Sequence, residues 1–126
     1  MKRFVLIFVC FLLLIVSACS SPLDLTGEDG AERILDISKD PEPWLGREIV
    51  FAGYYAYEDF GIRYHYVLLG KDAAGNNPGF EIRWNGDFPE SGAPVKVRGE
   101  LKEVTEFGQK YIYLELSDLT LLQPVE

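Results

Sequence analysis

Histidine and cysteine, which serve most often in nucleophilic catalysis and zinc binding, are scarce in this sequence. His65 is the sole histidine of the 126 residues, and it stands between two tyrosines. A zinc site draws its ligands from several histidine, cysteine or carboxylate side chains, and no second histidine is available. The serines that a histidine-centred triad would need lie outside any nucleophile-elbow motif. They are Ser38, Ser91 and Ser117. We therefore predict no catalytic residue, no metal and no cofactor.

Two acidic residues leave one hydrolytic chemistry open. Asp72 and Asp87 flank a short predicted strand, and glycosidases cleave sugars with a pair of carboxylates. Acidic side chains that only solvate a turn are much commoner. The nearby run Gly75-Asn76-Asn77-Pro78-Gly79 lacks the lysine and the following helix of a phosphate-binding loop, and it predicts a turn.

The N-terminus has the parts of a secretory signal peptide. Lys2 and Arg3 precede an uncharged apolar run that ends at Val16, and small residues follow it. The run is shorter than the roughly 20 apolar residues that a transmembrane helix needs. Its end, Val16-Ser17-Ala18-Cys19, resembles the lipobox of bacterial lipoproteins. The resemblance implies that residues 1–18 are removed and that the sulfur of Cys19 carries a diacylglyceryl group.

Charge and cysteine content narrow the range of partners. The formal charge of the full chain is −8, and loss of residues 1–18 removes two cations and no acidic residue, so the charge falls to −10. Nucleic-acid binding draws its affinity from clustered cations, so we expect no nucleic-acid partner. The same charge repels anionic lipid head groups, which leaves the acyl chains on Cys19 as the membrane attachment. Because Cys10 belongs to the removed segment, no disulfide is expected within the mature chain.

Downstream of the lipobox, the sequence divides into a tether, a helix and a strand-rich domain. Residues 19–29 hold the lipidated cysteine and a run without hydrophobic period, which predicts a flexible tether. Residues 30–43 predict a short helix, capped by Asp29 and stopped by a Pro-rich turn. The folded domain is expected over residues 44–122, followed by a tail at 123–126.

The folded domain is expected to contain five β-strands. They are predicted at residues 47–58, 62–69, 80–84, 95–102 and 110–116. Gly53 and Gly99 lie inside the first and fourth strands, where interior glycines mark bulges or sharp bends. Five strands that bend in this way predict a mainly β fold, a small OB-like (Greek-key) barrel preceded by one short helix. A six-stranded meander and an open sandwich are the alternatives.

Alternation along the second and third strands predicts a binding face. The inward side chains are expected to be Ile49, Phe51, Tyr64, Tyr66, Phe80, Ile82 and Trp84. The outer face would then carry Arg63, His65, Glu81 and Arg83. In OB-folds this face commonly holds the ligand, and aromatic rings beside hydrogen-bonding side chains suit sugars, peptides or a protein partner. The competing interpretation is that the charged positions are only solvated and that the rings fill the barrel.

Three segments resemble small bacterial lipoproteins, largely uncharacterised, whose single domain is OB-fold-like. They are Trp44-Leu45-Gly46-Arg47-Glu48-Ile49, Lys71-Asp72-Ala73-Ala74-Gly75-Asn76-Asn77-Pro78-Gly79-Phe80-Glu81 and Gly108-Gln109-Lys110-Tyr111-Ile112-Tyr113-Leu114. The resemblance covers most of residues 31–122. Members of this family often carry adjacent cysteines where this chain has Asn76 and Asn77, and a third where it has Ile112. Metal or redox chemistry of those thiols is therefore not implied for this chain.

The expected function is that of a lipoprotein anchored by Cys19 to a membrane of the bacterial cell envelope, on its extracytoplasmic side. We expect a non-catalytic binding or interaction module whose partner is an envelope protein or a small ligand. A small-ligand or oligosaccharide-binding lipoprotein is the first alternative, and it needs a concave pocket with aromatic walls. A lipid-anchored hydrolase is the second, and it needs two carboxylates or a histidine-centred site that converge in space.

Overall fold

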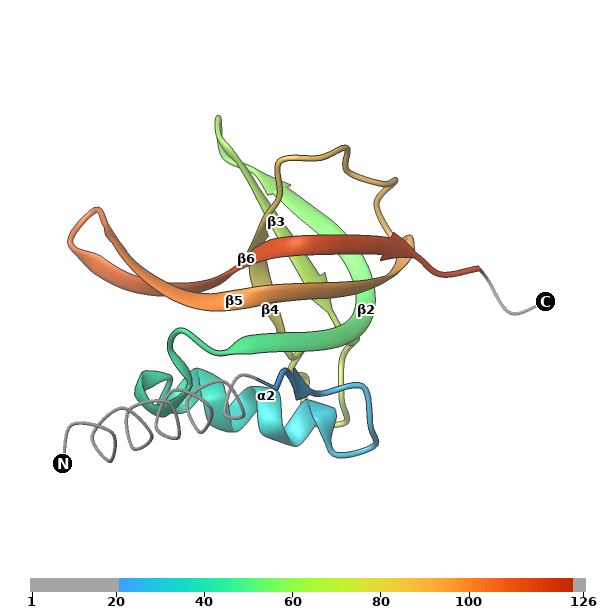
Figure 1. Ribbon diagram of the computed structural model, residues 1–126. Coiled ribbons are helices and arrows are strands. Elements are labelled where there is room, and N and C mark those ends of the chain that lie inside the picture. The colour runs from blue at the N-terminus through green and yellow to red at the C-terminus, as the bar shows by residue number, and fades with distance from the viewer. Residues whose placement is uncertain (1–20, 124–126) are drawn as a thin grey trace, which may run out of the picture.

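A closed ring of β-strands forms the body of the protein (Figure 1). The computed structural model describes residues 21–123, so the predicted signal peptide (1–18), Cys19 and residues 124–126 of the predicted tail lie outside the described residues. The strands of the ring are β2 (Glu48–Asp59), β3 (Arg63–Leu68), β4 (Gly79–Arg83), β5 (Pro94–Glu106) and β6 (Gln109–Leu121).

The order of these strands gives the barrel its topology. The chain of neighbours runs β2-β3-β4-β6-β5, and β5 also pairs with β2, which closes the ring. Within the ring every pairing is antiparallel except that of β4 with β6, which is parallel. The predicted fold class is therefore confirmed: a mainly β, OB-like Greek-key barrel preceded by one short helix. Ring closure excludes the open sandwich, and the pairing of β4 with β6 excludes the six-stranded meander.

Two glycines allow neighbouring strands to approach closely where the ring bends. A Cβ added at Gly53 would lie 2.7 Å from the carbonyl oxygen of Leu68, and one added at Gly99 would lie 2.7 Å from that of Glu115. A side chain at either position would therefore clash with the backbone of the next strand. The β5–β6 ladder also shifts register between Arg98 and Gly99, where the sequence predicted a bulge or bend.

A helix covers one end of the barrel. Helix α2 (Gly30–Lys39) lies below the strands in Figure 1, and its Ile34 and Ile37 side chains are buried in the core. Asp29 precedes it at the predicted cap position, although its side chain makes no capping hydrogen bond. The helix ends before Pro41, and the short 3-10 helix η1 (Glu42–Trp44) leads into β2. The barrel contributes to the same core Ile49, Phe51, Tyr55, Val67, Phe80, Ile82, Val95, Val97, Leu101 and Leu114.

The flexible tether predicted at residues 19–29 is wrong at residues 23–25. Residues Leu23–Asp24 form a short strand, β1, that pairs parallel with β2, and the N–H of Leu25 donates to the carbonyl of Val50 at 2.8 Å. Leu23 and Leu25 are buried in the core, and only 2% of Leu25 is exposed. The two leucines alternate with Asp24, a pattern that is too short to be recognised as a strand in sequence but long enough to bury two aliphatic side chains.

Two hairpins extend beyond the barrel. In Figure 1 the β2–β3 hairpin rises above the barrel, and the β5–β6 hairpin reaches to the left. The β5–β6 ladder continues to the pair Glu106–Gln109, which is further than the predicted strands at 95–102 and 110–116. The extra residues pair with each other outside the core, so the alternation of buried and exposed side chains that marks a strand in sequence is weaker there.

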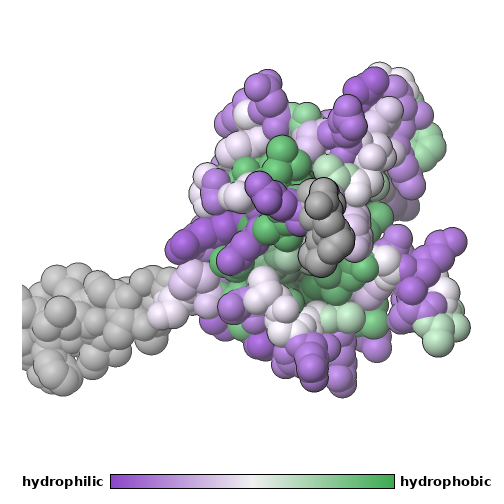
Figure 2. Space-filling view, turned by 90° about the vertical axis from the view of Figure 1, so that its right-hand side faces the viewer, coloured by the Kyte–Doolittle hydropathy of each residue, from purple (hydrophilic) through white to green (hydrophobic). Residues whose placement is uncertain are grey.

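Hydrophilic residues surround the hydrophobic ones on the face turned to the right in Figure 1. Figure 2 shows this face, where hydrophobic residues gather near the middle and charged or polar residues lie around them. Within residues 21–123, no helix combines the length and the apolar composition needed to cross a membrane.

Burial of Leu25 leads to a first testable prediction. Leu25→Ala removes a fully packed side chain and should lower the free energy of unfolding by about 2–5 kcal/mol, because the neighbours collapse only partly into the cavity. Leu121→Ala is the matched control, since Leu121 is 61% exposed, and it should change the free energy by less than about 0.5 kcal/mol. Urea unfolding followed by fluorescence measures both, and equal effects would show that residues 23–25 are not part of the core.

Candidate functional site

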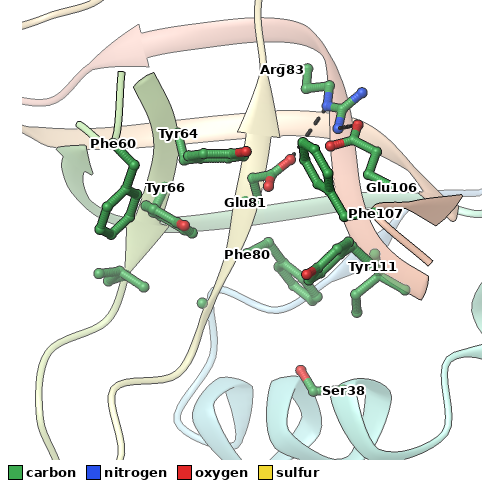
Figure 3. A pocket seen from close by; sticks show the side chains of 13 residues that line it. Ser38, Phe60, Tyr64, Tyr66, Phe80, Glu81, Arg83, Glu106, Phe107 and Tyr111 are labelled. Atoms are coloured by element: carbon green, nitrogen blue, oxygen red, sulfur yellow. Dashed lines mark hydrogen bonds and ion pairs between the residues drawn. The ribbon is translucent and has the colours of Figure 1, made fainter. Parts of the chain in front are cut away.

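A groove with aromatic walls lies between the two projecting hairpins (Figure 3). One wall comes from the β2–β3 hairpin, and the other comes from the β5–β6 hairpin. The walls are formed by Phe60, Tyr64 and Tyr66 on the first side and by Phe107 and Tyr111 on the second. Glu81 and Arg83 of β4 lie between them. We call this site the aromatic groove; its volume is about 490 Å³.

The structure divides the four residues that were predicted to share one outer face. Glu81 and Arg83 lie in the aromatic groove, as part of its floor. His65 pairs with the inward residue Ile82, so His65 and Arg63 belong to the other face of the sheet. The prediction of one common face is therefore wrong for Arg63 and His65. All four residues do border a second hollow of about 590 Å³, which lies beside the β2–β3 hairpin.

Val67 determines which side chains of β3 point inward. Val67 is fully buried and pairs with Phe80, whereas Tyr66 pairs with Glu81 on the outer face. Because side chains alternate along a strand, Tyr64 and Tyr66 also face outward and line the aromatic groove. The sequence prediction placed both tyrosines inside because this strand has apolar residues at both alternations. The core takes the aliphatic side chain, and the tyrosine hydroxyls stay within reach of water.

Arg83 holds two glutamates together on the floor of the groove. Its Nε lies 3.3 Å from a carboxylate oxygen of Glu81, and its Nη2 lies 2.8 Å from a carboxylate oxygen of Glu106. The guanidinium also stacks over Tyr113, 4.1 Å from the ring centre. Burial raises the pKa of the Glu81 carboxyl, and the neighbouring Arg83 opposes that shift only in part. With both carboxylates ionised, the three charged groups carry one excess negative charge.

His65 belongs to a separate cluster that closes the barrel end away from α2. Its Nδ1 lies 2.7 Å from the hydroxyl oxygen of Tyr55, and its ring stacks on Phe88 with ring centres 3.7 Å apart. Phe88 comes from the loop between β4 and β5, and this loop is held by the N–H of Gly92, which donates to the carbonyl of Tyr55 at 2.7 Å. Burial, followed by the positive charge of Arg63, lowers the pKa of His65. These contacts give His65 a packing role.

Phe107 is the residue of the groove whose conformation is least usual. It forms a two-residue turn with Gly108 between the last pair of the β5–β6 ladder, and both residues have positive φ, 53° and 76°. Such turns favour Asn-Gly, because a bulky side chain is strained at positive φ. Phe107 is nevertheless 87% exposed and gains little burial in return. The signal in the sequence is an aromatic residue in place of Asn directly before a turn glycine.

Three of the side chains considered for catalysis form hydrogen bonds with the backbone. The Asp72 carboxylate accepts hydrogen bonds from the N–H groups of Ala74 and Asn76, both at 2.9 Å. The hydroxyls of Ser38 and Ser117 donate to backbone carbonyls. Among residues 21–123, no group of three or more His, Cys, Asp or Glu side chains is placed to hold a metal ion.

Comparisons with known proteins do not identify a family for this chain. No protein-family model and no curated protein matches it significantly. One similar solved structure is described as an OBody bound to hen egg-white lysozyme, with 17% sequence identity, a TM-score of 0.44, and coverage of 66% of this chain and 86% of that chain. The OB-like topology therefore rests on the strand order and register of this chain.

The lowered pKa of His65 predicts how stability depends on pH. The unfolded chain binds a proton at His65 near pH 6.5, whereas the folded protein binds it only at lower pH. The free energy of unfolding should therefore fall as the pH drops from 7.5 to 5.5. His65→Gln removes the titrating group and keeps a side chain able to form hydrogen bonds, so its free energy of unfolding should fall less over the same interval. Urea unfolding at both pH values gives the two slopes, and equal slopes would contradict the burial of a neutral His65.

Proposed function

We propose that this chain is a small bacterial lipoprotein that uses the aromatic groove to bind a partner at the surface of a membrane of the cell envelope. The signal peptide (1–18) and the lipobox that ends at Cys19 support the anchor and the extracytoplasmic location. The barrel supplies a rigid support for a groove between two hairpins. The proposed role is binding without catalysis.

Phe107 is the observation that carries this proposal. An exposed phenylalanine at a positive φ contributes nothing to the core and strains its own turn. Asparagine or glycine at this position would relieve the strain and remove an exposed apolar ring. A side chain that weakens the fold in this way is best explained by a contact with another molecule, and its place on the rim of the aromatic groove indicates where that molecule lies.

The charges of the groove favour a partner that is not a polyanion. Arg83, the cation on the groove floor, already pairs with Glu81 and Glu106. Proteins that stack single-stranded nucleic acid on aromatic rings also need cations along the backbone path. Aromatic rings beside a negatively charged floor therefore suit a neutral or positively charged partner, and the negative charge of the whole chain agrees with this.

One observation favours the hydrolase alternative, although less strongly. Glu81 and Glu106 lie in one groove, and the raised pKa of Glu81 is a property of many general acids. The guanidinium of Arg83, however, lies between them and binds both carboxylates. A scissile bond held between the two acids would have to displace Arg83 from both ion pairs, so we favour a structural use of this cluster.

The proposed anchor can be tested through its cysteine. In a bacterium that processes lipoproteins, the full chain should incorporate labelled palmitate, and Cys19→Ala should abolish the incorporation and leave an uncut precursor. Cys10→Ala is the matched control, because Cys10 lies within the predicted signal peptide and should leave acylation and cleavage unchanged. Labelling that survives Cys19→Ala would falsify the proposed lipidation.

The strain at Phe107 leads to a prediction about stability. Phe107→Asn should raise the free energy of unfolding by about 1 kcal/mol, because Asn tolerates positive φ. Phe60→Asn is the control, since Phe60 is also exposed and lines the groove but has no positive φ, and it should not stabilise the protein. Urea unfolding of the three proteins checks the difference.

Binding at the groove can be followed in the same cells by site-specific photo-crosslinking. A photoreactive phenylalanine analogue at position 107 of the full chain should give crosslinks to an envelope component. The same analogue at Tyr54, which is 54% exposed and lies outside the groove, should give at least about tenfold less. Equal crosslinking at both positions would show that the groove is not the binding surface.

A further inference from the structure

The wall of the aromatic groove includes a strand edge that the barrel does not use. Strands β4 and β6 run parallel, but only Ile82 pairs with Leu114 and Arg83 with Glu115. Residues 109–113 of β6 pair with β5 on one side, and no partner for them is present on the β4 side within residues 21–123. Residues 79–81 of β4 are likewise paired with β3 alone. The two strands therefore diverge toward their N-terminal ends.

The aromatic groove occupies this gap between β4 and β6. Its lining includes Gly79 and Phe80 from β4 and Tyr111 and Ile112 from β6. In Figure 3 Tyr111 lies on one side of the gap and Phe80 and Glu81 lie on the other. An unpaired strand edge presents N–H and C=O groups at alternate residues, which makes it a template for another extended chain. The groove thus combines backbone hydrogen-bonding groups with aromatic walls.

We propose that the occupant of the aromatic groove is an extended peptide segment with basic side chains, which pairs through its backbone with the free edge of β6 at residues 109–113. This inference rests on the proposed function and names the partner of the same site. Strand addition gives affinity through main-chain hydrogen bonds, and pockets for alternate side chains give specificity. The rings of Phe60, Tyr64 and Phe107 contact the side chains of the bound segment.

Charge favours a basic segment over a neutral or acidic one. Glu81 and Glu106 together outnumber Arg83 on the groove floor. The Glu81 side chain is only 16% exposed, so a lysine or arginine that enters the groove can replace part of the solvation that its carboxylate has lost. Cations also bind favourably over tyrosine and phenylalanine rings. The net charge of −8 for the whole chain attracts such a segment from a distance.

The free edge also distinguishes a peptide from an oligosaccharide. Sugar rings stack on aromatic side chains, but they do not present donors and acceptors at the strand repeat of about 6.6–6.8 Å for every second residue. A peptide strand does, and it satisfies the edge of β6 along its length. A second copy of this chain would pair in the same way through its own β6, but two acidic grooves facing each other would repel.

The test begins with a displayed library of random heptapeptides, selected on the full-length, detergent-solubilised protein. We expect enrichment of peptides rich in lysine or arginine. When such a peptide is bound, the backbone amide hydrogens of residues 109–113 of the protein should exchange with solvent more slowly. Each enriched peptide is then synthesised in two forms, N-methylated on one or the other set of alternate residues. At least one form should lose tenfold or more in affinity, because N-methylation removes the N–H groups that face β6. Full affinity in both forms would overturn strand pairing.

Variants of the protein separate this inference from the proposed function. Glu106→Gln should weaken binding of the basic peptide several-fold, whereas Glu100→Gln should not, since Glu100 forms a comparable surface ion pair with Lys102 outside the groove. Two other results are possible. In the first, no peptide is enriched and a chito-oligosaccharide binds to the protein. In the second, sedimentation detects self-association of the protein, and Phe107→Asn abolishes that self-association. Either result overturns the peptide proposal and leaves the groove as a binding site. Equal crosslinking from positions 107 and 54 overturns the proposed function itself.

Discussion

Closure of the ring between β2 and β5 is the constraint on which the rest of the structure depends. Seven register pairs, from Glu48–Glu100 to Tyr54–Pro94, join the two strands, so the first strand of the ring also pairs with the fourth. Each of the two strands also passes close to its other neighbour at a glycine, because a Cβ at Gly53 or Gly99 would lie 2.7 Å from a backbone carbonyl oxygen of β3 or β6. Once the ring is closed, the surplus length of β2, β5 and β6 leaves the barrel as hairpins. The aromatic groove is the space between those hairpins, so it follows from the same closure.

Most of the fold could be predicted from the sequence because its signals are local. Pro41 ends the helix, Gly99 marks the bulge, and the alternation of Val95 and Val97 with charged residues marks a half-buried strand. The failures come from places where the local signal is ambiguous or short. Apolar residues occupy both alternations of β3, so the burial of Val67 decides its faces only in three dimensions. Strand β1 has two residues, too few for any period to be visible.

The groove collects the features that are least favourable for stability. It holds a phenylalanine at positive φ, a glutamate whose carboxyl is partly desolvated, and a strand edge that lacks a partner within residues 21–123. By contrast, no buried side-chain polar atom of residues 21–123 lacks a hydrogen bond, and the core is wholly apolar or aromatic. Sequences that obey local rules everywhere else tend to break them at functional positions. Glu81 and Arg83 of this site could be predicted from the sequence, whereas its two walls are visible only once the strands are arranged in space.

The parallel pairing of β1 with β2 also limits how the barrel can be oriented on a bilayer. With the proposed acyl chains on Cys19, only four peptide steps separate the lipid from Leu23, which the core holds firmly. Even a fully stretched backbone covers about 14 Å over that distance. This short connection attaches the domain to the lipid surface at one fixed point, so the domain has a preferred orientation there instead of tumbling freely. Partners would approach the two hairpins from a restricted range of directions.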